Sequence, residues 1–231
     1  TFRIRADARW SNGDPVTAAD FVFGLQRLVD PATAAFYAAE LGNVVNAAVI
    51  VAGDKEPADL GVVAPDERTL VVSLQRPTPY LLSLLTHPST FPVHRGSVAQ
   101  HGDAFARPGT LLSNGAYVLA DWEPGAVIDL QRNTHYWNDA ETSIDVVRYH
   151  VVTQEQAEFN RYRADELHVT STVPPENFEQ IRADYAGELH VAPTLGVYYY
   201  GFNLTRPPFA DNAELRQALS MAIDREVLGE R

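Results

Sequence analysis

The sequence predicts a mixed α/β fold of the α+β type, built from short strands and short helices in irregular order. Segments 70–74 and 127–132 are rich in β-branched and alternating apolar residues, which is typical of strands. Segments 18–28 and 214–222 have apolar residues three or four positions apart, which indicates helices. Because the two types do not alternate strictly, a regular doubly wound sheet is not expected. The 231 residues are 45% hydrophobic, enough for one large or two small cores.

The opening segment predicts a strand, a tight turn and a capped helix. Apolar and basic residues alternate over residues 2–6, as in a half-buried strand. Residues 11–15 read Ser-Asn-Gly-Asp-Pro, a composition that favours a turn. Thr17 can cap the helix that follows, with Asp20 three residues later, and this helix is expected to end before Asp30.

Further elements follow along the chain. The apolar run 43–53 can be a helix or a strand from its pattern alone. Additional helices are expected at 32–41, 80–85, 97–105, 154–164 and 177–184. Additional strands are expected at 116–120, 144–152, 167–170, 189–192 and 197–202. Two prolines interrupt 87–93, which predicts a loop at a domain boundary.

The composition excludes several classes of function. The net charge of −12 argues against a nucleic-acid backbone or an anionic membrane surface as the main partner. The absence of cysteine excludes disulfides, thiolate metal sites and a cysteine nucleophile in these residues. No 18-residue apolar run, phosphate-binding loop, dinucleotide-binding loop or G-x-S-x-G motif occurs. We therefore expect no catalytic residue, no metal ligand and no cofactor.

The histidines do not change that expectation. His87, His94 and His101 are seven residues apart, a spacing that would place them on one helix face. Pro88 and Pro92 interrupt any such helix, so the three are expected to be unrelated.

The opening stretch also resembles a known family. It reads F-x-[IL]-R-x-x-A-x-W-S-[ND]-G-x-P-V-T-A-x-D-F-V from residue 2 to residue 22. This order of residues is similar to that of the family 5 solute-binding proteins of ABC transporters, the dipeptide and oligopeptide receptors. Other motifs of that family occur in the same order: D-P-x-T-A-x-x-Y at 30–37, D-x-x-T-L-x-V-x-L-x-x-P-x-P-Y at 66–80, H-P-S-T-x-P-V at 87–93, N-G-A-Y-x-L-x-x-W at 114–122, R-N-x-x-Y-W-N at 132–138, N-R-Y-R-A-x-E at 160–166, Y-Y-Y-x-x-N at 198–203 and R-x-A-L-x-x-A-I-D-R at 216–225.

The resemblance covers the whole chain, and two of its motifs are most similar to the oligopeptide and murein-peptide receptors. It implies a periplasmic-binding-protein type II-like fold, here incomplete, with the extra domain typical of peptide receptors. Residues 1–95 would form most of the extra domain, 96–195 the middle segment of the first lobe, and 196–231 the start of the second lobe. The chain begins inside a predicted strand and stops at 229–231 after a helix-like run, so we expect a piece of a longer receptor. The resemblance favours a helix at 43–53.

By the same resemblance, the protein is an extracytoplasmic and non-catalytic component of an ABC transporter. It would capture short peptides for import and deliver them to the permease subunits. It is expected to be periplasmic or membrane-anchored and extracellular, to be a monomer and to bind no nucleic acid.

Four ligand-binding residues are implied by position: Tyr37, Ser171, Thr172 and Tyr199. Tyr37 corresponds to a family tyrosine that reaches the peptide from the extra domain, and a half-buried structural ring is the alternative. Ser171 and Thr172 stand where the oligopeptide receptors carry an asparagine, in a segment that is one residue shorter here. Thr194 replaces a family tyrosine, and both departures bear on ligand preference.

Tyr199 corresponds to a family tyrosine that faces the cleft. In a strand, Tyr198 and Tyr200 would share one face and Tyr199 would lie on the other. Strand geometry alone does not select the face, so the assignment of Tyr199 rests on the resemblance. Asn203 is expected either to fix the crossover into the second lobe or to cap a turn.

Three alternatives stay open. The receptor could bind another solute, such as a nickel chelate or a sugar. A hydrolase or lectin-like domain acting on a polymer would need a carboxylate pair or a nucleophile with its base, and no recognisable pair occurs. A receptor-like sensor module of a cytoplasmic regulator would require a DNA-binding segment outside these residues.

Overall fold

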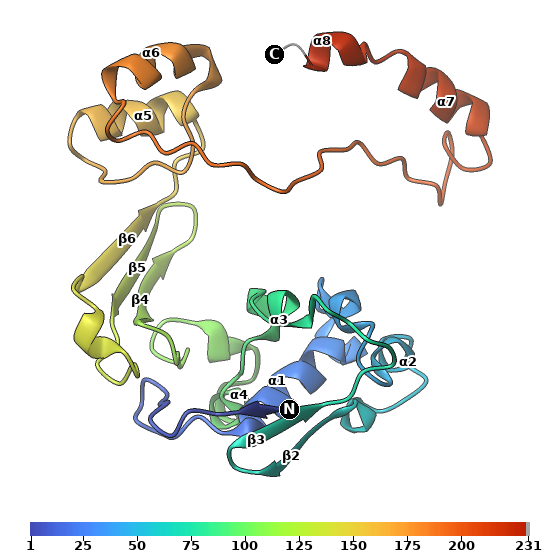
Figure 1. The fold of residues 1–231 in the computed structure, drawn as a ribbon, viewed down its shortest axis with the longest axis vertical. Coiled ribbons are helices and arrows are strands. Elements are labelled where there is room, and N and C mark those ends of the chain that lie inside the picture. Colours follow the sequence, from blue (N-terminus) through green and yellow to red (C-terminus); the bar gives the residue numbers. More distant parts are fainter. Residues whose placement is uncertain (230–231) are drawn as a thin grey trace. The chain divides into compact units, whose positions relative to one another are not determined.

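The computed structural model describes residues 1–229 of the chain (Figure 1). The chain forms two compact units, Thr1–Thr170 and Ser171–Arg231, and each is described by itself. Glu230 and Arg231, where the chain was expected to stop after a helix-like run, lie outside the described residues. The expected domain boundaries at 95 and 195 stay predictions.

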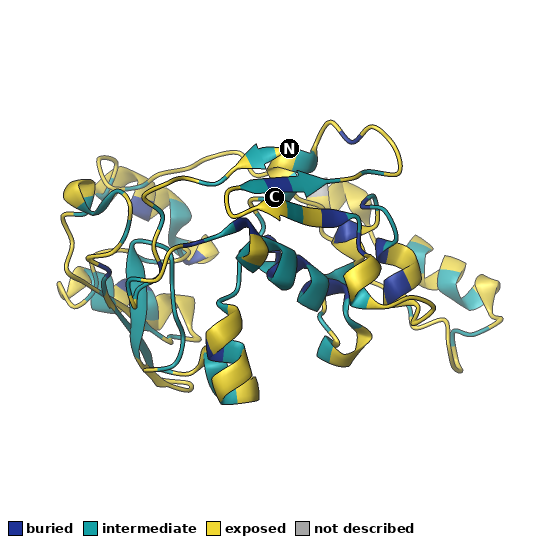
Figure 2. Cartoon of the chain, turned by 90° about the horizontal axis from the view of Figure 1, so that it is seen from below, coloured by how far each residue is buried: buried dark blue, intermediate teal, exposed yellow. Residues whose placement is uncertain are grey.

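The first unit opens with a small antiparallel sheet and a helix packed against it. Strands β1 (Phe2–Arg3), β3 (Thr69–Val72) and β2 (Val62–Asp66) pair in the order β1-β3-β2. Helix α1 (Ala18–Val29) contacts both β2 and β3. Figure 2 shows buried and half-buried residues along this helix.

The turn and the cap predicted before α1 are confirmed. The backbone N–H of Trp10 donates to the carbonyl of Asp14 at 2.8 Å, and Gly13 takes a φ of 90° that favours glycine. Asp20 then accepts a hydrogen bond from the Thr17 backbone at 2.8 Å, which satisfies a donor that precedes the helix. Helix α1 ends at Val29, directly before the Asp30-Pro31 pair.

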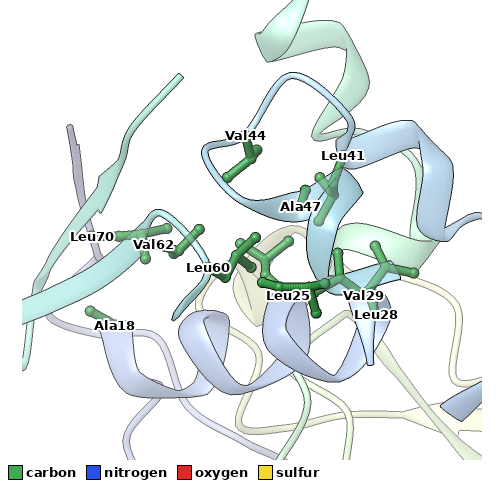
Figure 3. Close-up of a cluster of buried hydrophobic side chains, with 11 residues drawn as sticks. Ala18, Leu25, Leu28, Val29, Leu41, Val44, Ala47, Leu60, Val62 and Leu70 are labelled. Atoms are coloured by element: carbon green, nitrogen blue, oxygen red, sulfur yellow. The ribbon is translucent and has the colours of Figure 1, made fainter. Parts of the chain in front are cut away.

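Eleven buried residues form the core of this unit, and Figure 3 shows them between α1, the sheet and a second helix, α2 (Ala47–Val51). They are Ala18, Leu25, Leu28, Val29, Leu41, Val44, Ala47, Ile50, Leu60, Val62 and Leu70. The ambiguous run 43–53 contains both predicted features, since α2 is a helix and Val44 forms an isolated bridge with Leu74.

The predicted helix over 32–41 is wrong in the middle. The structure has two separate 3₁₀ turns, Pro31–Thr33 (η1) and Ala38–Leu41 (η2). Ala34 ends the first turn with a left-handed φ of 50°, a conformation that interrupts the helical ladder. The backbone bonds on both sides span three residues, from Ala34 to Pro31 and from Ala38 to Ala35, as in 3₁₀ geometry.

The rest of the first unit contains a second antiparallel sheet. Its strands β4 (Tyr117–Glu123), β5 (Val127–Arg132) and β6 (Val146–His150) pair in the order β4-β5-β6. The predicted strands at 116–120, 127–132 and 144–152 are thus confirmed, with shifted ends. The remaining helical segments are 3₁₀ turn η3 (Pro57–Asp59), helix α3 (Leu81–Leu84), 3₁₀ turn η4 (Pro88–Thr90), helix α4 (Arg95–His101), 3₁₀ turns η5 (Gly102–Ala106) and η6 (Asp139–Glu141), and helix α5 (Glu155–Arg163).

The second unit is helical where it is regular. It contains 3₁₀ turn η7 (Pro175–Asn177) and helices α6 (Phe178–Asp184), α7 (Ala213–Met221) and α8 (Arg225–Gly229). The predicted helices at 177–184 and 214–222 are therefore confirmed.

Three predicted strands, 167–170, 189–192 and 197–202, do not form within the described residues. A strand needs a neighbouring backbone to receive its N–H and C=O groups. Residues 193–201 are exposed throughout and pair with no other strand in the part of the chain that the structure describes. The extended pattern in the sequence is therefore present without the pairing that makes a strand.

Candidate functional site

Tyr37 lies at a break between two short turns of the first unit. It directly precedes η2, whose last residue, Leu41, is buried in the core. The Tyr37 side chain remains 45% exposed. Its ring centroid lies 5.1 Å from that of Phe36 in an edge-to-face arrangement and 4.5 Å from that of His87. We call Phe36, Tyr37 and His87 the aromatic ladder.

His87 is held in place by the turn that it begins. Its Nδ1 accepts a hydrogen bond from the Ser89 backbone at 3.3 Å and lies 2.8 Å from the Ser89 hydroxyl. Both contacts occupy Nδ1, so the ring proton of a neutral His87 belongs on Nε2. The Thr90 hydroxyl donates to the His87 carbonyl at 2.8 Å. The imidazole therefore has a fixed position beside Tyr37.

Helix α1 in turn supports η4. Gly24 of α1 lies so close to the chain that a Cβ there would stand 2.9 Å from the Phe91 carbonyl oxygen and 3.3 Å from the Val93 nitrogen. Only glycine allows this approach without a shift of one backbone. Helix α1, which begins within the opening motif, thus packs against the turn that follows His87.

The aromatic ladder has two polar atoms that are available for hydrogen bonds to a ligand. Among the residues that the structure describes, neither the Tyr37 hydroxyl nor the His87 Nε2 has a hydrogen-bond partner. A phenol can donate or accept, and an Nε2–H donates. The pair can therefore bind a carbonyl or carboxylate oxygen next to an apolar ring.

The other three predicted site residues belong to the second unit. Ser171 and Thr172 open that unit in an exposed segment without regular structure. Tyr199 is 79% exposed and has no ring partner within the described residues. Tyr37 thus belongs to the first unit, and the other three predicted site residues belong to the second. The ligand-binding roles of all four stay predictions.

The tyrosine run shows the predicted alternation even without a strand. The rings of Tyr198 and Tyr200 meet edge to face with centroids 5.5 Å apart, so the two lie on one side of the chain. A hydrogen bond with the Tyr200 hydroxyl raises the pKa of Tyr198. Asn203 accepts hydrogen bonds from the backbone and hydroxyl of Thr205 at 3.0 and 2.7 Å, which is the turn-capping role.

Sequence reasoning missed the place of His87, because it treated the residue as an isolated loop histidine. The H-P-S-T motif contained the signal: a capping side chain followed by proline at the first position of a helical turn. The contact with Tyr37 joins positions fifty residues apart in sequence, which no local pattern reveals.

A cavity of about 420 Å³ lies elsewhere in the first unit. Its lining is mainly apolar and includes Phe2, Phe21, Leu70, Leu85, Phe91 and Trp137. A peptide main chain needs convergent hydrogen-bonding groups, and this lining offers few. Over residues 1–229, no cluster of three His, Asp or Glu side chains could hold a metal ion. The same residues include no helix with the length and apolar character needed to cross a membrane.

Comparisons with known proteins support the resemblance. The family model described as bacterial extracellular solute-binding proteins, family 5, middle part, matches residues 1–231. The periplasmic oligopeptide-binding protein OppA of Haemophilus influenzae is 44% identical over 234 residues, which cover 100% of this chain and 43% of the relative. The chain therefore spans less than half the length of the relatives that it matches.

The solved structures agree. The crystal structure of Haemophilus influenzae OppA in complex with RPPGFSPFR superposes with a TM-score of 0.95, covering 100% of this chain and 45% of that one. The structure of the Escherichia coli murein tripeptide binding protein MppA, 39% identical, gives a TM-score of 0.93 over 100% of this chain and 45% of that one. The expected type of fold, and its incompleteness, are thus confirmed.

One relative has a different kind of name. The probable deoxycholate-binding periplasmic protein YgiS of Escherichia coli is 39% identical over 232 residues, covering 100% of this chain and 43% of the relative. Family membership alone therefore does not identify the solute. The family model nevertheless matches every residue of the chain, and the chain belongs to family 5 of the bacterial extracellular solute-binding proteins.

Proposed function

We propose that this chain is part of a receptor that captures short peptides outside the cytoplasmic membrane for import by an ABC transporter. The observation that carries the proposal is the likeness to OppA, at 44% identity and a TM-score of 0.95 to a peptide complex. The receptor is non-catalytic and hands its ligand to the permease subunits. It is a monomer in the periplasm or anchored to the outer face of the membrane.

The Tyr37 hydroxyl is the proposed contact from the extra domain. It donates a hydrogen bond to a main-chain carbonyl or accepts one from an amide of the peptide. Its free hydroxyl, its half-exposed ring and its fixed neighbour His87 support this role. Main-chain contacts of this kind do not depend on peptide sequence, so one site can serve many peptides.

Ser171, Thr172 and Tyr199 are the proposed contacts from the second unit. Their hydroxyl groups can donate to or accept from a peptide backbone. Thr172 and Tyr199 are well exposed, which leaves their side chains accessible. The proposed domain map assigns 1–95 to most of the extra domain, 96–195 to the middle segment of the first lobe and 196–231 to the start of the second lobe.

A second candidate is a receptor for a different solute on the same fold. The likeness to the probable deoxycholate-binding protein YgiS favours this alternative over a change of fold or mechanism. A steroid acid would use apolar contacts more than main-chain hydrogen bonds.

Calorimetry of the full-length receptor that contains this chain separates the two candidates. It should be titrated with mixed di- to pentapeptides, deoxycholate, a nickel chelate and a sugar. We expect saturable heat with peptides and none with the other three. Saturable heat with a non-peptide solute and none with any peptide would overturn the proposal.

A variant ties the result to the site. Tyr37→Phe removes the hydroxyl and keeps the ring, so we expect peptide affinity to fall about three- to tenfold, equivalent to one hydrogen bond. Tyr149→Phe, at an exposed tyrosine on β6, is the matched control and should leave affinity unchanged.

A further inference from the structure

Phe36 is exposed to an unusual degree for a phenylalanine. Its side chain is 90% exposed, more than any other phenylalanine, tyrosine or tryptophan described in the first unit. A single exposed apolar residue is common on protein surfaces and means nothing by itself. Phe36 differs from such a residue because its ring is part of the ordered aromatic ladder.

The ring of Phe36 rests on a built support. It meets Tyr37 edge to face at 5.1 Å and 78°, a preferred geometry for aromatic pairs. The other ring neighbour of Tyr37 is His87, with the ring centroids 4.5 Å apart. A hydrogen bond with the Ser89 hydroxyl holds the His87 ring in place. The left-handed backbone at Ala34 takes the chain out of the helix just before this point. Tyr37 is the one ring partner of Phe36 within the described residues.

The ladder combines two kinds of contact within a few ångströms. Phe36 offers an uncovered apolar ring, while Tyr37 and His87 offer free hydrogen-bonding atoms among the described residues. A ligand that matches both needs a polar main chain with a large apolar side chain beside it. A peptide with an aromatic or large aliphatic residue has this chemistry.

We propose that Phe36 is a specificity-determining residue that receives an aromatic or large aliphatic side chain of the bound peptide. This inference rests on the proposed function, since it requires a peptide at Tyr37. The ring buries its exposed area against the ligand side chain, which favours such peptides over those with a small residue at that position. The peptide RPPGFSPFR, bound by Haemophilus influenzae OppA, carries two phenylalanines, so that relative accepts aromatic side chains.

The test measures peptide preference in the full-length receptor. Calorimetry compares Ala-Ala-Ala with Phe-Ala-Ala, Ala-Phe-Ala and Ala-Ala-Phe. We expect the wild type to bind one of the three phenylalanine peptides about three- to tenfold more tightly than Ala-Ala-Ala. Phe36→Ala should abolish that preference and leave the affinity for Ala-Ala-Ala within about twofold, because the main-chain contacts remain. Phe36→Leu should keep part of the preference.

Two controls make the result specific. Tyr149→Ala removes another exposed aromatic ring, on β6, and should leave the preference intact. The melting temperature of Phe36→Ala without peptide should match that of the wild type, because an exposed ring contributes little to the fold. A lower melting temperature with an unchanged preference would show that Phe36 packs against another part of the protein, and would overturn the inference.

The remaining outcomes separate this inference from the proposed function. Peptide binding with no preference for phenylalanine, or with a preference that persists in Phe36→Ala, overturns the role of Phe36 alone. Binding of a non-peptide solute and of none of the four peptides overturns both.

Discussion

Asp20 accepts three hydrogen bonds through one carboxylate oxygen. The donors are the Thr17 backbone at 2.8 Å, the Thr17 hydroxyl at 3.0 Å and the Trp10 indole nitrogen at 3.4 Å. The Trp10 side chain is buried, and Asp20 is the hydrogen-bond acceptor of its indole N–H. The residue therefore joins the helix cap to the core of the opening motif.

Replacing Asp20 tests that role. Asp20→Ala leaves the Thr17 and Trp10 donors without this acceptor, and we expect a loss of about 1–3 kcal/mol in unfolding free energy. Asp20→Asn keeps an acceptor oxygen and should cost less. Urea denaturation of both variants measures the difference, and equal losses would contradict the account.

An ion pair on the second sheet predicts a pH dependence. Arg148 donates two hydrogen bonds to Asp129, both 2.6 Å long. The guanidinium holds the pKa of Asp129 below its usual range. A carboxylate with a lowered pKa in the folded state stabilises the protein above its unfolded pKa, and that contribution is lost as the pH falls through the folded pKa.

Arg148→Met should therefore raise the pKa of Asp129 and lower stability at pH 7. The difference from the wild type should shrink as the pH falls from the ordinary pKa of an aspartate, about 4, through the lowered pKa of Asp129. Carboxyl NMR titration and urea denaturation at both pH values measure these effects. Arg182→Met is the control, since its pair with Glu179 is longer, at 3.6 Å, and more exposed. A stability difference that grows in acid would contradict this reasoning.

At the scale of elements, α1 carries the clearest relation between sequence and function. Its close contact at Gly24 supports the turn that holds His87 beside Tyr37. An alanine in a helix interior is normally favourable over glycine by about 1 kcal/mol. At this position the added Cβ would stand 2.9 Å from the Phe91 carbonyl oxygen, so the sign should reverse.

We expect Gly24→Ala to destabilise the protein by about 1–3 kcal/mol through this overlap. Ala19→Gly, at an exposed position of the same helix, reports the helix propensity alone and should cost about 0.5–1 kcal/mol. Thermal denaturation compares the two variants. A Gly24→Ala protein that is more stable than the wild type would contradict this prediction, because it would show that the segment at Phe91 moves away from the added Cβ without cost.

Elements with local signals were predictable from the sequence. The cap of α1 and the turn at 11–15 depend on neighbouring residues, and both were found. The strands β3 and β5 were also found, because each has a partner strand on both sides. The prediction of a helix over 32–41 was wrong because helical propensity does not reveal the left-handed backbone of Ala34. The prediction of a strand over 197–202 was wrong because a strand depends on a partner strand, which the local sequence does not reveal.

The candidate site was predictable only in part, for the same reason. The family motif pointed to Tyr37, but its contacts with Phe36 and His87 depend on where two loops meet. The roles of Ser171, Thr172 and Tyr199 rest on position in the family pattern.

At the scale of the whole molecule, the chain spans 43–45% of the relatives that it resembles. By the proposed domain map it contains most of the extra domain, the middle segment of the first lobe and only the start of the second lobe. A receptor that closes on its ligand needs both lobes to exclude water. We therefore expect residues 1–231 alone to bind a tripeptide at least about 100-fold more weakly than the full receptor, equivalent to about 2.7 kcal/mol. Calorimetry with one peptide on both proteins measures this, and equal affinities would contradict the domain map.

The central claim is that this chain contributes Tyr37 to a peptide site. A crystal structure of the full receptor with a bound tripeptide tests it most directly. We predict that the Tyr37 hydroxyl lies within about 3 Å of a main-chain atom of the peptide, as a hydrogen bond requires. A peptide bound with no atom near Tyr37 would contradict the claim.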